Sequence, residues 1–389
     1  MRTEKIRVLH PITRLIIGGA QENTILTAAL LNPADWAVTI LSGPQTGSEG
    51  SLIETAREQG LALEIEPTLV REINPLKDLL ALLRMMRLMR NGGYTIVHTH
   101  SSKAGILGRW AAKWAGVPII VHTVHGWAHH ERQHPLVRAI YIYLEKLTLP
   151  ITDKLIAVTS LDINKGLADG IGRADNYVTI RSGIELDRFG HPQVPRAETR
   201  AALGIPAEAP VIGTVTRLSP QKAPLDFVRA AGRIVQSHPQ SWFMMVGDGP
   251  LRPDVEALAA ELGITDRLVL TGLRRDVPEL LAAMDLFTLS SLWEGLPRVL
   301  PQAMATGLPI VATACDGSAE AISDGDNGFL VPSSNPDLLA ERLCRLLDDS
   351  ALAARMGEEG RARVAEFSDR RMVEQIDTLY RELLARKVP

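Results

Sequence analysis

The sequence predicts an α/β protein of two domains, each built on an open, mostly parallel β-sheet. A length of 389 residues with 46% hydrophobic composition is enough for two domains, each with its own core. Short runs of β-branched residues alternate with longer amphipathic segments, which is typical of βα units. This alternation restarts after residues 188–200, a Pro- and charge-rich stretch without a hydrophobic period that we interpret as the linker.

The strands are predicted from short apolar runs that turn residues delimit, and helical patterns fill the intervals between them. In the first half the predicted strands are residues 6–10, 36–42, 61–65, 94–100, 118–124, 154–159 and 177–180. In the second half they are residues 210–218, 241–247, 267–272, 285–291 and 309–313. From residue 335 onward the pattern is helical throughout. We therefore expect domains over residues 1–190 and 191–368, followed by a helix over 369–389.

Composition and charge exclude several classes of protein. The net charge is −3 and neither half of the chain is strongly basic, so no nucleic-acid partner is expected. The two cysteines, Cys315 and Cys344, show no CxxC spacing, which indicates packing residues in a reducing compartment. The N-terminus has no apolar segment typical of a signal peptide, and no run of 18 apolar residues occurs. We therefore expect a cytoplasmic protein.

Ligands of open α/β sheets bind beyond the carboxyl ends of the strands, so the residues that follow each strand are informative. Gly18 and Gly19 precede a helical run and offer either bare amides for an anion or a tight packing turn. Histidines gather in the loops HTHSSKAGILGR and HTVHGW, which predicts a polar cleft floor suited to a hydroxyl-rich ligand. His98 and His100 also have a metal-ligand spacing, but no carboxylate lies nearby. Among these side chains, His125 is the principal candidate.

In the second half, Arg217 and Lys222 follow a predicted strand and precede a helix. Two cations beside a helix start can hold a diphosphate, although they can equally be solvated surface charges. Glu294 and Gly295 follow another strand, and a helix beginning near Pro297 or Arg298 directs its free N–H groups toward the same crevice.

These motifs together resemble glycosyltransferase family 4. The GGA turn at Gly18, the HTH and HGW loops, IRSGIELDRF (180–189), TRLSPQK, VGDGPL, SSLWEGLPRVLPQAMATGLPIVAT and DGSAEAISDGDNGFLVP (316–332) stand in the order and spacing of that family. The resemblance covers nearly the whole chain. It implies GT-B architecture, in which two Rossmann-like α/β/α domains face each other across a cleft, with residues 369–389 packing back toward the N-terminal domain.

The resemblance also implies a role for each matching residue. The first domain would bind the acceptor and the second a nucleotide-sugar donor. Glu294 would contact hydroxyls of the donor sugar, and His125 would reach that sugar from the first domain. The remaining matches would bind the donor diphosphate and nucleotide: Gly18, Gly19, Arg217, Lys222, Arg274, Gly295 and Leu296.

Gln302 departs from the family pattern, which has a second Glu there that receives the two ribose hydroxyls. An amide keeps one acceptor oxygen but loses the charge-assisted contact, a loss of about 1–2 kcal/mol. Pro301 is also unusual, because deep in a helix it would cost about 3 kcal/mol. We therefore expect the helix to begin near Arg298, so that Pro301 lies in its first turn.

The reaction implied is a retaining, front-face transfer that needs neither a metal nor a cofactor. A UDP-sugar would be the donor, and a glycan or lipid-linked precursor of a surface polysaccharide the acceptor. Two alternatives stay open: a nucleotide-sugar 2-epimerase with the same architecture, and a non-catalytic partner subunit, for which Gln302 is the hint. Residues 74–93 combine Leu and Met with Lys77, Arg84, Arg87 and Arg90. This segment is either an amphipathic helix covering the sheet or a helix that binds the membrane surface peripherally.

Overall fold

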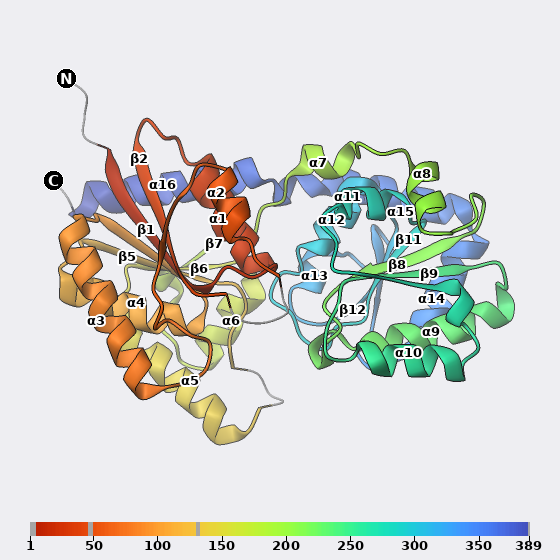
Figure 1. The fold of residues 1–389 in the computed structure, drawn as a ribbon, viewed down its shortest axis with the longest axis horizontal. Helices are drawn as coiled ribbons and strands as arrows, with labels where there is room; N and C mark the ends of the chain where they lie inside the picture. The colour runs from red at the N-terminus through yellow and green to blue at the C-terminus, as the bar shows by residue number, and fades with distance from the viewer. Residues whose placement is uncertain (1–4, 46–49, 130–132, 388–389) are drawn as a thin grey trace. The chain divides into compact units, whose positions relative to one another are not determined.

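The computed structural model describes residues 5–45, 50–129 and 133–387, and it divides the chain into two compact units (Figure 1). The first unit comprises Met1–Gly183 together with Asp369–Pro389, and the second comprises Ile184–Ser368. Residues 1–4 belong to the N-terminus in which no signal peptide is expected, and they lie outside the described part of the chain.

The first unit is built on a parallel sheet of seven strands in the order β3-β2-β1-β4-β5-β6-β7. Its strands are β1 (Ile6–Arg14), β2 (Trp36–Gly43), β3 (Ala62–Ile65), β4 (Ile96–His100), β5 (Ile119–Val124), β6 (Lys154–Ala157) and β7 (Tyr177–Thr179). All seven were predicted from the sequence, although β1 runs on to Arg14. Its helices are α1 (Gly19–Leu30), α2 (Ile53–Glu58), α3 (Pro75–Gly92), α4 (Ser102–Ala115), α5 (Pro135–Thr148), α6 (Ser160–Ala168) and α16 (Asp369–Lys387).

Helices cover both faces of this sheet because successive strand residues point to opposite sides. Val8, Ile96 and Ile119 face one way and pack against the apolar stripe of α16, which contains Ile376 and Tyr380. The neighbouring residues of each strand, such as Leu9, Val97 and Ile120, face the other way and pack against α3 and α4. Side chains two positions apart on a strand therefore share a face, and this periodicity also places the histidines described below.

Helix α3 shows how the local sequence sets its limits. Asn74 is the N-cap and its side chain accepts a hydrogen bond from the backbone N–H of Lys77 at 3.1 Å, while Pro75 occupies the first helical position. Gly93 ends the helix with φ 59°, a conformation that glycine adopts without steric cost.

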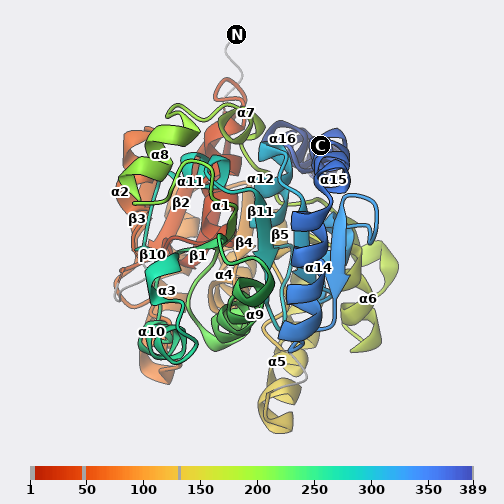
Figure 2. The same cartoon turned by 90° about the vertical axis from the view of Figure 1, so that its right-hand side faces the viewer.

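The second unit is built on a parallel sheet of six strands in the order β10-β9-β8-β11-β12-β13. Its strands are β8 (Val211–Val215), β9 (Trp242–Val246), β10 (Leu268–Gly272), β11 (Leu286–Leu289), β12 (Ile310–Thr313) and β13 (Gly328–Val331). The sequence predicted all of them except β13, an edge strand of four residues. Its helices are α7 (Leu186–Gly190), α8 (Arg196–Ala202), α9 (Pro224–Ser237), α10 (Arg252–Glu261), α11 (Val277–Ala282), α12 (Val299–Thr306), α13 (Ser318–Ala321), α14 (Pro336–Asp348) and α15 (Ser350–Arg363). Figure 2 shows α9 and α14 side by side in this unit.

The interpretation of residues 188–200 as a linker was wrong, because α8 begins within this stretch and belongs, with the whole stretch, to the second unit. A polar side chain anchors the helix: Arg200 is buried, donates to the carbonyl of Ala283 at 2.9 Å and pairs with Asp285 at 2.7 Å. Hydrophobic periodicity does not detect a helix that an ion pair holds in place. The passage between the units instead falls at Gly183 and Ile184.

The helical tail predicted from residue 335 onward is confirmed by α14, α15 and α16. No helix among the described residues is long and apolar enough to cross a membrane.

Candidate active site

Each sheet reverses its strand order once, between β1 and β4 in the first unit and between β8 and β11 in the second. In open α/β sheets ligands bind beyond the carboxyl ends of the strands at such a reversal, because the loops on its two sides diverge and leave a crevice. The predicted site residues of each unit are therefore expected near these two reversals.

At the β8/β11 reversal the structure brings Lys222 and Glu294 together. Lys222 ends a 3₁₀ turn (Pro220–Lys222) that follows β8, and Glu294 lies in the loop after β11. The Lys222 ammonium forms an ion pair with Glu294 Oε1, and the two side chains are 21% and 7% exposed. A carboxylate this buried needs its cation, because an isolated charge is costly to remove from water. The ion pair thus places one cation and one anion beyond the carboxyl ends of β8 and β11.

Two further residues orient Glu294, and the sequence analysis identified neither. The hydroxyl of Ser291 donates to Glu294 Oε1 at 2.6 Å, and the backbone N–H of Glu294 donates to Asp316 Oδ2 at 3.0 Å. Asp316 adopts φ 37°, a left-handed conformation that Asp tolerates better than most residues. These hydrogen bonds hold both the side chain and the backbone of Glu294.

Helix α12 begins where the sequence predicted, with Arg298 at its N-cap and Val299 as its first residue. Pro301 is therefore the third helical residue, in the first turn, where a missing N–H breaks no intrahelical hydrogen bond. Gln302 follows directly and its backbone N–H donates to the carbonyl of Arg298 at 3.1 Å. The proline is accommodated without a kink.

The other predicted donor-binding residues of this unit follow different strands. Arg217 is exposed just after β8, and Gly295 and Leu296 follow Glu294. Arg274 follows β10 and binds both carboxylate oxygens of Asp276, at 2.8 and 2.5 Å. These hydrogen bonds lower the pKa of Asp276 and raise that of Arg274. The strand order places β9 between β10 and β8, so Arg274 lies further along the edge of the sheet than Lys222.

In the first unit, Gly18 precedes α1 and Gly19 is its first residue, as predicted for a glycine turn at a helix start. The neighbouring loops are tied together at the β1/β4 reversal. The hydroxyls of Thr13 and Ser101 are hydrogen-bonded at 2.7 Å, and the hydroxyl of Thr13 accepts from the backbone N–H of Ala104 at 3.2 Å.

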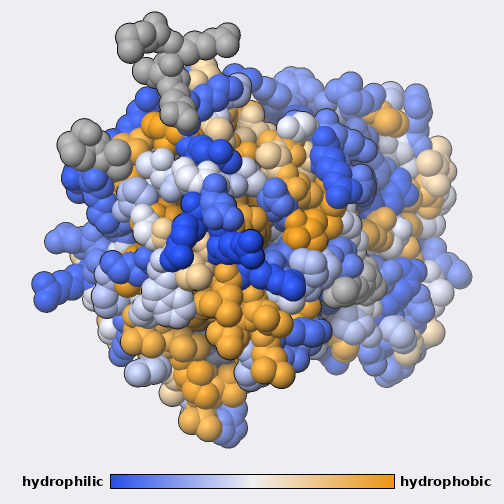
Figure 3. Space-filling model, turned by 60° about the vertical axis from the view of Figure 1, so that its left-hand side comes forward, coloured by the Kyte–Doolittle hydropathy of each residue, from blue (hydrophilic) through white to orange (hydrophobic). Residues whose placement is uncertain are grey.

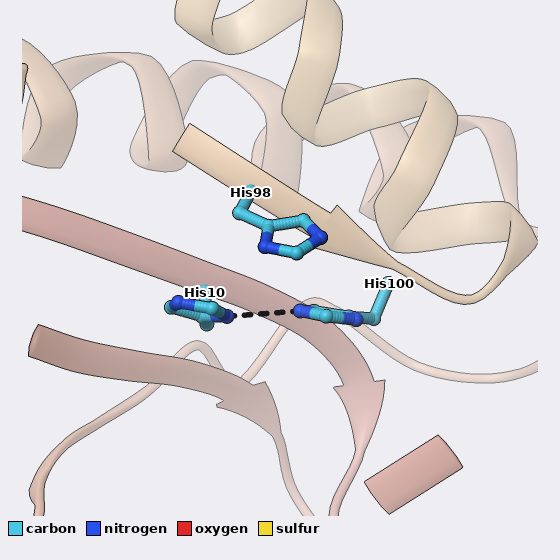
Figure 4. Close-up of side chains that lie close together, drawn as sticks. All are labelled: His10, His98 and His100. Atoms are coloured by element: carbon cyan, nitrogen blue, oxygen red, sulfur yellow. Dashed lines mark hydrogen bonds between the residues drawn. The ribbon is translucent and has the colours of Figure 1, made fainter. Parts of the chain in front are cut away.

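Four histidines lie on or next to β1, β4 and β5: His10 and His98 in the middle of their strands, His100 at the end of β4, and His125 just after β5. His10, His98 and His100 are fully buried and their rings lie close together (Figure 4). Nδ1 of His10 lies 2.9 Å from Nε2 of His100, whose Nδ1 lies 3.1 Å from Nε2 of His125. His125, the principal candidate of the sequence analysis, follows β5 at the half-buried end of this series.

Burial keeps the three inner histidines neutral. Loss of hydration lowers the pKa of His10 to about 3 and lowers those of His98 and His100 well below their ordinary value. The neighbouring histidines lower the last two further, because adjacent imidazolium charges would repel. A neutral imidazole can donate at one nitrogen and accept at the other.

The nitrogens of His10, His98 and His100 come within 4.8 Å of one another, close enough to raise the question of a metal ion. Hydrogen bonds within the protein account for these atoms instead. Both nitrogens of His98 are engaged at 2.6 Å, Nδ1 by the hydroxyl of Tyr380 and Nε2 by that of Thr123. Within the described residues the group also contains no carboxylate to balance a divalent charge. The set therefore fits a hydrogen-bond network better than a metal centre.

The chain matches two family models that together cover most of its length. Residues 17–188 match Glycosyltransferase Family 4, and residues 195–363 match Glycosyl transferases group 1. The UDP-Gal:alpha-D-GlcNAc-diphosphoundecaprenol alpha-1,3-galactosyltransferase of Escherichia coli is 32% identical over 98% of each chain. The chain belongs to glycosyltransferase family 4.

Another relative agrees with this membership, and solved structures show the fold. The D-inositol 3-phosphate glycosyltransferase of Salinispora arenicola is 32% identical over 76% of this chain and 70% of its own. The Anabaena HepE structure in complex with UDP and glucose has a TM-score of 0.84 and 22% identity, covering 97% of this chain and all of its own. WaaG, a glycosyltransferase involved in lipopolysaccharide biosynthesis, has a TM-score of 0.75 and 19% identity, covering 96% and 99%. The family 4 chain thus has the two-domain GT-B fold and is a glycosyltransferase.

The residues that the family motifs assign to the donor site lie at different distances from one another in the structure. Lys222 and Glu294, which the motifs assign to donor diphosphate and donor sugar, are in direct contact. Gln302 and Arg274 lie on other elements of the same unit, α12 and the loop after β10. The network around His125 extends much further than the motifs indicate, because Tyr380 comes from α16, a helix with no family motif.

Proposed function

We propose that this family 4 glycosyltransferase moves a sugar from a UDP-sugar to a lipid-linked glycan precursor of a surface polysaccharide, with retention of configuration and without a metal. The observation that carries the proposal is the pair Lys222–Glu294 at the reversal of the second sheet. A transferred sugar attached to a diphosphate needs both partners, since a carboxylate accepts hydrogen bonds from hydroxyls and an ammonium stabilises phosphate charge.

The relative from Escherichia coli supports the choice of substrates. Its name gives UDP-Gal as donor and a GlcNAc on diphosphoundecaprenol as acceptor, and it aligns over 98% of both chains. The name also gives an α-1,3 linkage, which a retaining transfer would form from a donor with an α-linked sugar. UDP-galactose and polyprenyl-diphosphate sugars are therefore the first substrates to test.

In the proposed reaction the acceptor hydroxyl attacks the anomeric carbon on the face from which UDP departs. The bond from that carbon to the β-phosphate oxygen breaks with its electron pair, and the hydroxyl proton passes to the departing phosphate. Lys222 and Arg217 would stabilise the developing charge, and Glu294 and His125 would hold the sugar. The protein then supplies electrostatic stabilisation and position, with no covalent intermediate on a side chain.

A thermal-shift assay with UDP, GDP and ADP at millimolar concentration tests the donor first, because a ligand that binds only the native state raises its apparent stability. We expect UDP alone to raise the Tm. Incubation of UDP-galactose with a polyprenyl-diphosphate sugar then tests transfer, and NMR of the product reports its anomeric configuration. Conversion of the donor without acceptor would favour a 2-epimerase, and nucleotide binding without turnover would favour a partner subunit.

Gln302→Glu is expected to tighten UDP binding roughly fivefold or more, because a carboxylate can accept both ribose hydroxyls in charge-assisted hydrogen bonds. Titration calorimetry of the two proteins with UDP measures the change. A UDP analogue without the ribose hydroxyls is the matched control, and the gain should disappear with it. Equal affinities for UDP would place Gln302 away from the ribose.

The surface of the first unit supports the acceptor class. Helix α3 buries Ala81, Leu82, Met85 and Met89, so it does cover the sheet, but four leucines of its other side are exposed. Helix α5, which the sequence analysis did not single out, also exposes a row of apolar side chains. The exposed residues are Leu76 (76%), Leu79, Leu80 and Leu83 on α3, and Leu136 (64%), Val137, Ile140, Tyr143 and Leu147 on α5. Figure 3 shows a hydrophobic area on this face with hydrophilic side chains beside it.

We propose that this α3/α5 surface rests on an anionic membrane. Helix α4 contacts both α3 and α5, so the three helices form one layer on the sheet. Lys77, Arg84, Arg87 and Lys146 are exposed on the same helices, and such cations are attracted to anionic lipids by about 1 kcal/mol each near the surface. This position would bring the first unit to an acceptor whose lipid is embedded in the bilayer.

Co-sedimentation with vesicles containing phosphatidylglycerol tests this surface. We expect the double variant Leu136→Gln/Ile140→Gln to lose most of the vesicle binding, because each exchange removes an apolar side chain that would insert between lipids. Leu262→Gln, at an exposed leucine of the second unit, is the control and should bind as the unmodified protein does. Binding that neither salt nor the double variant reduces would contradict the proposal.

A further inference from the structure

The first unit contains a continuous series of hydrogen bonds from His125 to helix α16. His125 contacts His100, and His100 contacts His10. Nε2 of His10 lies 3.4 Å from the hydroxyl of Tyr380, which in turn lies 2.6 Å from Nδ1 of His98. Nε2 of His98 lies 2.6 Å from the hydroxyl of Thr123. We call these six groups the histidine chain.

The sheet geometry explains why these residues meet. The register aligns Val8 with Ile96, and His100 with Thr123. Residues two positions apart on a strand share a face, so His10, His98, His100, Thr123 and His125 all project toward the side on which α16 packs. Tyr380 is the residue of α16 that lies over them, and its ring packs edge-on against His98.

The direction of the hydrogen bonds follows from the far end of the chain. The hydroxyl of Thr123 is buried, and among the described residues its hydrogen bond is to His98. A buried hydroxyl that only accepted would leave its own hydrogen unsatisfied, so Thr123 donates to Nε2 of His98. His98 is then protonated on Nδ1 and donates to Tyr380, since a neutral imidazole carries a single hydrogen.

The same rule propagates along the remaining groups. The hydroxyl of Tyr380 donates to Nε2 of His10. The Nδ1–H of His10 then donates to Nε2 of His100. The Nδ1–H of His100 donates in turn to Nε2 of His125. Burial raises the pKa of the Tyr380 hydroxyl well above its ordinary value, and together with the lowered histidine values this keeps every inner member neutral. Each hydrogen from Thr123 to His100 is thus used once.

We propose that the histidine chain fixes His125 as its Nδ1–H tautomer, with Nε2 anchored toward the protein interior, and that Tyr380 is a positioning residue for His125. The protein interior then fixes both the tautomer and the ring orientation of His125. The consequence for catalysis rests on the proposed function, in which His125 holds the donor sugar. The tautomer of His125 does not depend on that function.

Two-bond ¹H–¹⁵N NMR spectra of protein labelled at histidine nitrogens measure this tautomer directly, and His125→Gln assigns the signal. We expect His125 to be protonated on Nδ1 in the unmodified protein. Tyr380→Phe and Thr123→Val each remove one hydroxyl while keeping the side-chain shape, and each should convert His125 to a mixture of tautomers. With a donor and an acceptor, the kcat of each variant should fall roughly tenfold while its KM for the donor changes little. Complete misplacement of a catalytic group would cost roughly 100-fold.

Tyr177→Phe is the matched control, because Tyr177 is another buried tyrosine of the first unit, and its hydroxyl donates to the carbonyl of Ile171 at 2.5 Å. It should lower the Tm without altering the His125 signals. His125 protonated on Nε2, or a tautomer unaffected by both variants, would overturn the proposal. So would one equivalent of tightly bound metal in elemental analysis. A shifted tautomer with unchanged turnover would reject the role in transfer, whereas a protein inactive with every donor but showing the expected spectra would reject only the proposed function.

Discussion

Lys222→Ala is expected to lower kcat/KM roughly 10²- to 10³-fold, the usual cost of removing one group that stabilises charge in a transition state. The departing diphosphate gains negative charge as the glycosidic bond breaks, and Lys222 is the cation that the structure places beside Glu294. Steady-state kinetics with the donor that gives the thermal shift measure the loss.

The ion pair requires a control, because Lys222→Ala also leaves Glu294 buried without its cation, which destabilises the fold. The double variant Lys222→Ala/Glu294→Gln removes that unpaired charge and should recover Tm but not activity. Arg229→Ala, which breaks an exposed ion pair with Asp226 at 2.9 Å on the neighbouring helix α9, should change neither. Recovery of turnover in the double variant would mean that the pair is only structural.

Glu294→Gln is expected to lower kcat roughly 10- to 30-fold, because sugar hydroxyls would donate to a neutral amide oxygen instead of a carboxylate. The amide oxygen can still accept from Ser291, so the side chain keeps its position. Comparison of kcat and KM for the donor separates the effect on the transition state from the effect on binding.

The variant Glu145→Gln is the matched control for Glu294→Gln. Glu145 is also 7% exposed and pairs with Arg109 at 2.7 Å, but it lies in the first unit, on α5. Its neutralisation should lower Tm and leave kcat unchanged. If Glu294→Gln behaves in the same way, with lower stability and full turnover, then Glu294 is a structural partner of Lys222 and not a sugar ligand.

Most strands could be predicted because they are short apolar runs between turn residues, and most of these runs are buried. The prediction failed where burial is shared with polar groups. Helix α8 is anchored by Arg200 and has no apolar period, and β13, Gly328–Val331, directly follows the turn residues SDGDN and was not recognised as a strand. The sequence therefore predicted the secondary structure best where the hydrophobic pattern alone determines it.

The candidate site could be predicted only in part, for a related reason. Lys222 and Glu294 lie in the segments that follow β8 and β11, which are adjacent in the sheet, so their proximity follows from the topology. Asp316 and Ser291 contribute through one hydrogen bond each, for which a single sequence carries no signal. Tyr380 is separated from His98 by 282 positions and meets it only because α16 covers that face of the sheet.

The composition of the first unit from Met1–Gly183 and Asp369–Pro389 has a consequence for biosynthesis. A ribosome makes the chain from its N-terminus, and domains generally fold as their residues emerge. Here the second unit, continuous from Ile184 to Ser368, can complete its fold before the first. Until α16 has emerged, the face of the first sheet that carries Val8, Ile96 and Ile119 lacks the helix whose apolar stripe completes its cover. A nascent chain stalled before Asp369 would thus hold a finished second unit beside an open first one, which is the stage at which a chaperone has a surface to bind.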